Sequence, residues 1–160
     1  MKKKHQTVKA VVFDFDGTIT KPGSIDFKAI QEEIGSPPNI SILEYIENVQ
    51  DPEEVKRAKD ILHTFEKNAA EASELNEGFE SVFAFLRKQN IKAGILTRNS
   101  RECVELTFGK FPRLKPEDFD GIITRDEIIK VKPNPQAIFY LAVQFSVKPE
   151  EIMMVGDHYF

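Results

Sequence analysis

Two aspartates, Asp14 and Asp16, follow directly on an apolar run that begins at Val8. An ionised carboxylate beside an apolar interior loses hydration, and this costs free energy unless a cation or a hydrogen-bond network replaces the water. A divalent metal ion is the simplest replacement. A solvated turn is the alternative, and it loses weight because further residues with matching chemistry occur downstream.

Those further residues are Thr97, Lys132 and Asp157. Together with Asp14 and Asp16, Asp157 would supply three carboxylates, and three carboxylates can hold one Mg²⁺, a hard cation that prefers oxygen ligands. The ammonium group of Lys132 and the hydroxyl of Thr97 suit phosphate oxygens. The sequence therefore predicts a combined metal and phosphate site.

Four predicted strands would position these residues, over residues 8–13, 91–97, 120–124 and 152–155. Amphipathic or capped helices are predicted between them over 79–88, 102–108 and 135–145, the last with Asn134 as its N-cap and Pro135 at its first position. Strands that alternate with helices predict an α/β fold with a doubly wound parallel sheet, whose ligand site lies at the carboxyl ends of its strands.

Residues 20–75 have a different pattern, with helix signals that are interrupted at 35–39. The clearest helix runs from Pro52 to about Leu75, with Asp51 as N-cap and Pro52 at the first helical position. Its apolar side chains recur at helical spacing, so this helix packs on another element. They are Val55, Ala58, Ile61, Leu62, Phe65, Ala69 and Ala72.

The reaction expected at such a site is phosphoryl transfer. Asp14 can attack phosphorus to form an aspartyl-phosphate, a known form of covalent catalysis by a carboxylate. Asp16 can protonate the departing alcohol oxygen and then deprotonate the water that hydrolyses the intermediate. Mg²⁺ and Lys132 would neutralise negative charge, because the carboxylates and the phosphate would otherwise repel each other.

Four segments of the chain resemble the motifs of the haloacid dehalogenase-like phosphohydrolases. They are Asp14-Phe15-Asp16-Gly17-Thr18, Ile95-Leu96-Thr97-Arg98-Asn99-Ser100, Lys132-Pro133-Asn134-Pro135 and Met154-Val155-Gly156-Asp157. The first is highly specific, and the order and spacing of the other three make a chance likeness improbable. The resemblance runs from Val8 to the last residue.

This resemblance implies a role for each matching residue and a division of the chain. Asp14 would be the nucleophile, Asp16 the general acid and base, Thr97 and Lys132 the phosphate holders, and Asp157 a magnesium ligand. Residues 1–19 and 77–160 would form the core, and residues 20–76 a small helical cap like that of phosphoglycolate phosphatase-like members. The family's fourth motif usually has a second acidic residue four positions after the first, so we expect a C-terminal part of the core to be missing after Phe160 and the strand over 152–155 to be left uncovered.

The expected activity is therefore magnesium-dependent removal of phosphate from a small phosphorylated metabolite. A phosphomutase that uses the same Asp14 is the alternative within enzymes, and a dehalogenase fits less well because it does not require the proton transfer by Asp16. A non-catalytic binding protein with the same fold is the alternative outside enzymes, and it would gain weight if the chain truly ended at Phe160.

Several residues have competing interpretations. A calcium loop starting at Asp14 would place Ile19 where glycine is required and Ile25 where a bidentate glutamate is required, so it does not fit. Lys130 is the alternative to Lys132, which the following prolines favour. Arg98 and Asn99 are near enough to bind substrate phosphate, although a surface role fits equally well. His158 and His63 are most simply solvated, the former with a possible supporting role beside Asp157.

Composition limits the remaining classes. The chain has 160 residues, is 41% hydrophobic and 30% charged, and has a formal net charge of -4. This composition is typical of a globular domain. The mild acidity gives no hint of nucleic-acid binding, and no apolar run approaches the roughly 18 residues of a membrane span. Cys103 stands alone, which fits a reducing compartment such as the cytoplasm. The oligomeric state does not follow from the sequence.

Overall fold

A parallel four-stranded sheet forms the centre of the protein. The computed structural model describes residues 7–130 and 132–158. Strands β1 (Ala10–Phe13), β2 (Lys92–Leu96), β3 (Gly121–Ile123) and β4 (Ile152–Val155) lie in the order β3-β2-β1-β4. The predicted α/β class and parallel sheet are confirmed, although the first three strands are shorter than predicted.

The central strand β1 is buried on both faces, which explains its continuous apolar sequence. Its alternate side chains enter two separate cores, because successive residues of a strand point to opposite faces. Val11 and Phe13 belong to one cluster, and Ala10 and Val12 belong to the other. The register pairs Phe13 with Ile95 of β2 and with Val155 of β4, so these three strands end side by side.

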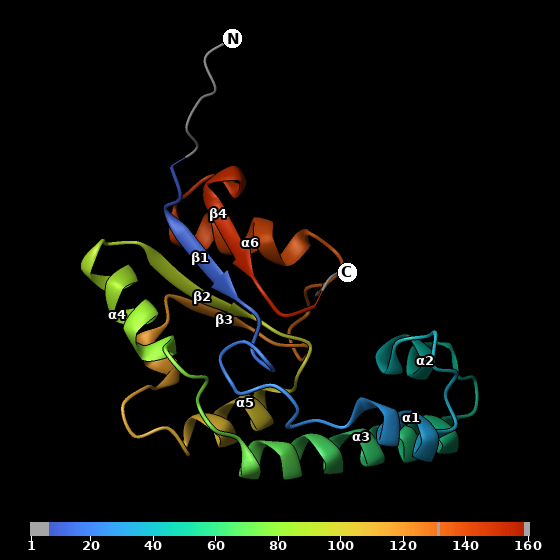
Figure 1. Ribbon diagram of the computed structural model, residues 1–160. Coiled ribbons are helices and arrows are strands. Elements are labelled where there is room, and N and C mark those ends of the chain that lie inside the picture. The colour runs from blue at the N-terminus through green and yellow to red at the C-terminus, as the bar shows by residue number, and fades with distance from the viewer. Residues whose placement is uncertain (1–6, 131, 159–160) are drawn as a thin grey trace.

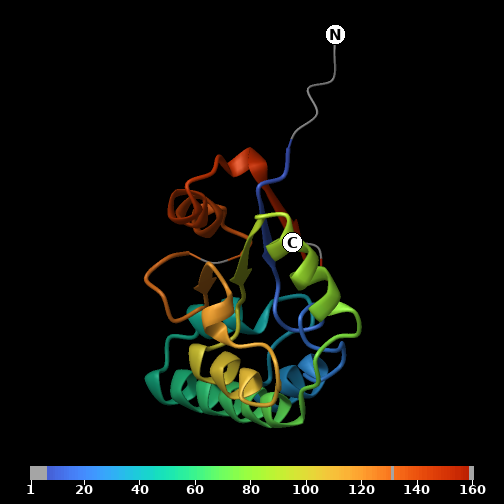
Figure 2. The same ribbon diagram turned by 90° about the vertical axis from the view of Figure 1, so that its left-hand side faces the viewer.

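Helices cover both faces of the sheet (Figures 1 and 2). On one face, α4 (Phe79–Lys88) and α5 (Arg101–Phe108) supply aromatic and aliphatic side chains to the cluster that contains Phe13. On the other face, α6 (Gln136–Phe145) packs Leu141 and Phe145 against the cluster that contains Val12. The arrangement is the predicted doubly wound one.

Three further helices lie beyond the carboxyl ends of the strands, as Figure 1 shows: α1 (Phe27–Ile34), α2 (Ile42–Asn48) and α3 (Pro52–Ala72). They share a hydrophobic cluster of their own, which is separate from the two clusters at the sheet. The chain enters and leaves this part through two neighbouring segments, because Thr20 and Leu75 form an antiparallel bridge. We call these three helices the α1–α3 layer.

Local capping explains where these helices begin. The side chain of Asp51 accepts a hydrogen bond from the backbone N–H of Glu53, and Pro52 occupies the first helical position, as predicted. The predicted break after α1 is also present, since Gly35 ends that helix in a left-handed conformation with φ of 81°.

Some helix boundaries differ from the prediction. Helix α3 ends at Ala72, because the backbone turns into an extended conformation at Ser73. Helix α6 begins at Gln136 with Pro135 as its N-cap, one residue later than predicted, although the side chain of Asn134 does accept a hydrogen bond from the N–H of Gln136 at 2.9 Å.

Two short 3-10 helices, η1 (Pro116–Asp118) and η2 (Pro149–Glu151), lead into β3 and β4. Strand β4 is at one edge of the described sheet, and its side chains Met153 and Met154 are exposed. This agrees with the expectation that β4 presents apolar surface. Within the part of the chain that the structure describes, the helices are too short or too polar to cross a membrane.

Candidate active site

A cavity of about 350 Å³ lies between the carboxyl ends of the strands and the α1–α3 layer. All of the site residues that the sequence predicts contribute to its lining, although they come from four separate segments. The lining residues are Asp14, Asp16, Ile25, Phe27, Gln31, Ser41, Ile42, Leu43, Leu62, Glu66, Thr97, Arg98, Asn99, Lys132, Asp157 and His158.

Asp14 lies at the end of β1 and is paired with Lys132. The Nζ atom of Lys132 is 2.5 Å from Oδ2 of Asp14, and both side chains are largely buried. The other carboxylate oxygen of Asp14 accepts a hydrogen bond from the backbone N–H of Phe15 at 2.8 Å. Lys130, the alternative to Lys132, is exposed and lies outside the lining of the cavity. The geometry therefore favours Lys132.

The loop after β1 is anchored by Phe15. Its side chain is fully buried against Phe108, and its carbonyl oxygen accepts hydrogen bonds from the N–H groups of Thr18, Ile19 and Thr20. These contacts wrap the loop tightly around one carbonyl group, and the wrapped loop carries Asp16 into the cavity.

Asp16 is held by Asn99, whose Nδ2 atom donates to both carboxylate oxygens at 3.2 and 3.1 Å. The pKa of Asp16 is raised to about 7, mainly by burial and also by the nearby charge of Asp14, while the hydrogen bonds from Asn99 act in the opposite direction. A pKa shifted toward neutrality suits a carboxyl group that first donates and later accepts a proton. Asn99 is itself buried, so the surface interpretation of this residue is wrong.

The turn after β2 places Thr97 and Arg98 at the same cavity. Thr97 is buried, and its Oγ1 atom accepts a hydrogen bond from the N–H of Asn99 at 3.0 Å. Arg98 reaches across to the α1–α3 layer, where its Nη2 atom donates to Oγ of Ser41 at 3.0 Å. The side chain of Arg98 thus links the sheet edge to α2.

Asp157 reaches the site from the segment after β4 and lies against Gly17. A Cβ atom at residue 17 would be only 2.2 Å from Oδ2 of Asp157, so the carboxylate occupies the space that a side chain would fill. Gly17 also has a φ of 76°, which favours glycine. His158 is exposed at the margin of the cavity.

The chemistry of three side chains at this cavity suits a hard divalent cation such as Mg²⁺, which prefers oxygen ligands. Asp14, Asp16 and Asp157 offer carboxylate oxygens to one cavity, and the space above Gly17 leaves room for the Asp157 carboxylate. Among the residues described, the group whose candidate ligand atoms all lie within 4.8 Å of one another is a different one, namely His63, Glu66 and Cys103. That group suits Mg²⁺ less well, because a thiol and an imidazole are softer ligands than carboxylate oxygens and burial raises the pKa of the Cys103 thiol.

Sequence reasoning missed Glu66 and Arg125. Glu66 lies on α3, and both of its carboxylate oxygens accept hydrogen bonds from the guanidinium group of Arg125, in the segment after β3. Burial raises the pKa of Glu66, and the hydrogen bonds from Arg125 oppose that shift. A signal was available, because Glu66 is four residues after Leu62 and three before Ala69 on the apolar stripe of α3.

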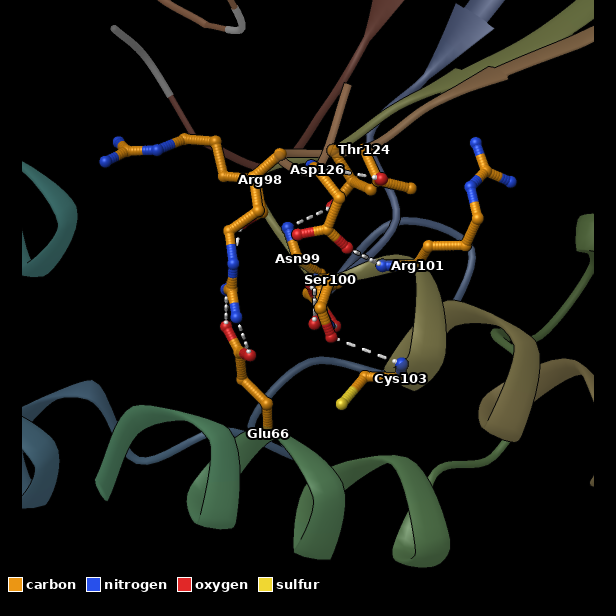
Figure 3. Close-up of polar contacts among 11 residues, drawn as sticks. Glu66, Arg98, Asn99, Ser100, Arg101, Cys103, Thr124 and Asp126 are labelled. Atoms are coloured by element: carbon orange, nitrogen blue, oxygen red, sulfur yellow. Dashed lines mark hydrogen bonds and ion pairs between the residues drawn. The ribbon is translucent and has the colours of Figure 1, made fainter. Parts of the chain in front are cut away.

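Arg125 also supports the turn that carries Arg98 and Asn99. Its backbone N–H donates to the carbonyl oxygen of Asn99 at 3.2 Å, and its guanidinium group donates to the carbonyl oxygen of Arg98 at 3.3 Å. Figure 3 shows Glu66 pointing up from α3 toward this turn, with Asn99 and Ser100 above it. A chain of contacts therefore joins α3 to Asn99, and through Asn99 to Asp16.

Comparison with known proteins gives a consistent family assignment. The sequence model of the haloacid dehalogenase-like hydrolases matches residues 8–159. An uncharacterized hydrolase from Saccharomyces cerevisiae is 33% identical, over 95% of this chain and 70% of its own length. A haloacid dehalogenase-like hydrolase domain-containing protein from Arabidopsis thaliana is 30% identical, and the chain spans 63% of its length.

Two further proteins carry names that refer to a substrate. The pyrophosphatase PpaX of Bacillus cereus is 29% identical over 95% of this chain and 76% of its own length. A crystal structure of a predicted phosphoglycolate phosphatase from Haemophilus somnus matches with a TM-score of 0.67 and 18% identity, covering 94% of this chain and 77% of that one. The second likeness concerns the fold alone.

Proposed function

The chain belongs to the haloacid dehalogenase-like hydrolase family, and from this membership we propose that it is a phosphatase acting on a small phosphorylated metabolite. The observation that carries the proposal is the placement of Asp14 and Asp16 in one cavity, with Lys132 Nζ 2.5 Å from Asp14 and Asn99 donating to Asp16. A carboxylate nucleophile, a second carboxyl group for proton transfer and a cation for phosphate are the groups that this reaction requires.

In the first step, a carboxylate oxygen of Asp14 attacks phosphorus. The bond between phosphorus and the ester oxygen breaks, and Asp16 donates its proton to that departing oxygen. The products of this step are the free alcohol and an aspartyl-phosphate on Asp14. Lys132 and the hydroxyl group of Thr97 stabilise the phosphate oxygens during the transfer.

In the second step, the deprotonated Asp16 takes a proton from a water molecule, whose oxygen attacks phosphorus. The bond between phosphorus and Asp14 breaks, and inorganic phosphate leaves. Asn99 keeps the Asp16 carboxyl group facing the cavity in both steps, because it donates to both oxygens. One carboxyl group thus serves as acid first and as base afterwards.

We include Mg²⁺ in the proposal, with Asp14, Asp16 and Asp157 as the residues that would hold it. A bound Mg²⁺ would supply positive charge that screens the phosphate from the carboxylates. Family membership and the oxygen donors at the cavity support this choice.

We also propose that the α1–α3 layer is the cap, comprising residues 20–76, and that the core comprises residues 1–19 and 77–160. The separate hydrophobic cluster of these helices and the bridge between Thr20 and Leu75 support that division. As a cap the layer would exclude water from the site while phosphate is transferred. A cytoplasmic location completes the proposal, since the one cysteine, Cys103, is a buried free thiol.

The substitution Asp14→Asn tests the assigned nucleophile. It keeps the size of the side chain, so we expect a folded protein whose magnesium-dependent hydrolysis of p-nitrophenyl phosphate falls by roughly 10³-fold or more. The control is Asp60→Asn, which neutralises an exposed carboxylate on α3 outside the cavity and should leave turnover near that of the unchanged protein.

Release of inorganic phosphate is measured in parallel with consumption of substrate, with and without Mg²⁺. Stoichiometric release to water supports a phosphatase, whereas retention of phosphate in an isomer of the substrate would indicate a mutase. Unchanged turnover by the Asp14→Asn variant would exclude Asp14 as the nucleophile.

A further inference from the structure

The cavity at the carboxyl ends of the strands has two chemically different sides. The sheet side carries Asp14, Asp16 and Lys132. The side formed by the α1–α3 layer and the segment before α1 is mainly apolar, and we call its five apolar residues the apolar wall. They are Ile25, Phe27, Ile42, Leu43 and Leu62.

Not all of the apolar wall is explained by packing within the layer. Ile42 and Leu62 are buried members of its hydrophobic cluster, and Ile25 and Leu43 pack against it, so packing within the layer accounts for these four. Phe27 differs, because it is 57% exposed at the first position of α1 and is not a member of that cluster. A phenyl ring that lines a cavity beside a catalytic site offers a large surface to a ligand.

The polar side chains on this side are already used in local contacts. Gln31 donates to the carbonyl oxygen of Ile40 at 3.1 Å, which closes the connection between α1 and α2. Ser41 caps α2 by accepting a hydrogen bond from the N–H of Glu44, and it also accepts one from Arg98. The layer therefore offers mostly apolar contacts to a ligand. Arg98 lies between this apolar side and the charged side of the cavity.

Charge on this side also limits the leaving group. Glu66 adds a carboxylate to the lining, balanced by Arg125. Among the residues described, the lysine and arginine side chains that line the cavity are Lys132, next to Asp14, and Arg98. Arg98 lies at the edge of the apolar wall, where it contacts Ser41, so an anionic leaving group that extends along the wall would lose hydration without meeting a further cation there.

We propose that the substrates are phosphomonoesters with an uncharged, apolar or aromatic leaving group, in preference to pyrophosphate or phosphoglycolate. This inference rests on the phosphatase activity proposed above and adds the substrate class. The phosphate contacts Lys132 and Thr97, and the leaving group lies along Phe27 and Leu43.

The test compares kcat/KM for four compounds with the unchanged protein: ethyl phosphate, hexyl phosphate, 2-phosphoglycolate and inorganic pyrophosphate. Ethyl and hexyl phosphate have alcohol leaving groups of similar reactivity, so their ratio reports contact with the wall rather than chemistry. We expect hexyl phosphate to exceed each of the other three by roughly tenfold or more, the range for hydrophobic groups that fill a pocket.

Two variants locate the effect. Phe27→Ala and Leu43→Gln should each reduce the ratio of hexyl to ethyl phosphate several-fold. The matched control is Phe85→Ala on α4, which removes a phenyl ring that is 58% exposed but lies outside the cavity, and it should preserve the ratio. Competitive inhibition by hexylphosphonate and ethylphosphonate gives a second measure of the same preference, independent of turnover.

The outcomes separate the two proposals. Hydrolysis of ethyl phosphate, phosphoglycolate or pyrophosphate at least as efficiently as hexyl phosphate would overturn the substrate class while leaving the phosphatase proposal intact. The same conclusion would follow if the preference for hexyl phosphate survived in both wall variants. If neither these four compounds nor p-nitrophenyl phosphate were hydrolysed in the presence of Mg²⁺, the proposed function would fail, and this inference with it. Hydrolysis of p-nitrophenyl phosphate but of none of the four would overturn the substrate class alone.

Discussion

At the scale of single residues, Gly17 decides whether Asp157 can reach the site. Its positive φ and the closeness of the Asp157 carboxylate are two separate reasons for glycine at this position. The sequence identifies Gly17 as part of a motif, but neither reason can be read from the motif. The space above Gly17 is used by a residue that lies 140 positions further along the chain.

The variant Gly17→Ala tests this use of space. Because the new Cβ meets the mobile end of a carboxylate, we expect Asp157 to move away while the fold is kept. The Mg²⁺ concentration for half-maximal activity should rise by roughly tenfold or more, as it does when a metal site loses its supporting geometry.

The matched control is Gly23→Ala. Gly23 has a φ of 85°, but a Cβ there would meet nothing within 4 Å. It therefore introduces the same backbone strain, on the order of 1 kcal/mol, without touching Asp157. An equal change in magnesium dependence in both variants would mean that strain, and not displacement of Asp157, is responsible.

At the scale of elements, the pair between Glu66 and Arg125 connects α3 to the turn after β2. The two side chains are 6% and 19% exposed, so the pair is mostly desolvated. Removing one partner of such a pair lowers the free energy of unfolding by more than an exposed ion pair contributes to it. The reason is that the other charge stays buried without an opposite charge beside it. The pair therefore fixes the α1–α3 layer against the sheet edge that carries Asn99.

We expect Glu66→Gln to lower the free energy of unfolding by about 1–3 kcal/mol, since the amide keeps the shape but leaves the Arg125 charge poorly compensated. Urea unfolding monitored by circular dichroism measures the change. Glu32→Gln is the control, because Glu32 forms an exposed pair with Lys28 within α1, and it should change stability by less than about 0.5 kcal/mol. A similar loss in both variants would contradict the structural role of the Glu66 pair.

At the scale of the whole molecule, Asp120 joins the sheet to the helical layer beside it. The Asp120 carboxylate, 14% exposed, accepts hydrogen bonds from Arg87 of α4 at 2.6 Å, from Lys92 of β2 at 2.8 Å and from the N–H of Ala93 at 2.9 Å. Burial acts to raise the pKa of Asp120, but the contacts with Lys92, Ala93 and Arg87 outweigh burial and lower the pKa below its ordinary value of 3.8.

This shift predicts a pH dependence of stability. A carboxyl group whose pKa is lower in the folded than in the unfolded state stabilises the fold above pH 3.8, and that contribution is lost as the pH falls through the folded pKa. Asp120→Asn should therefore lower the free energy of unfolding at pH 7 by about 1–3 kcal/mol. The difference from the unchanged protein should shrink below pH 3.8, and a constant difference down to pH 2 would contradict the assignment.

Much of the architecture follows from the sequence by itself, because strand and helix periodicity and capping are local properties. The buried run before Asp14 and the Asp51-Pro52 start of α3 are examples, and both predictions are confirmed. The sequence also predicts that Thr97, Lys132 and Asp157 lie at the same edge of the sheet, because parallel strands end together and the order of the motifs matches a known family. Their proposed roles stay predictions until the variants are measured.

The tertiary structure decided what depends on distance in space rather than along the chain. It placed Lys132 beside Asp14, buried Asn99 against Asp16, paired Glu66 with Arg125, and placed Phe27 on the cavity. None of these placements has a sequence period, because each depends on how segments that are distant in the chain pack together. Local patterns position a residue on an element, whereas packing between elements determines which residue it meets.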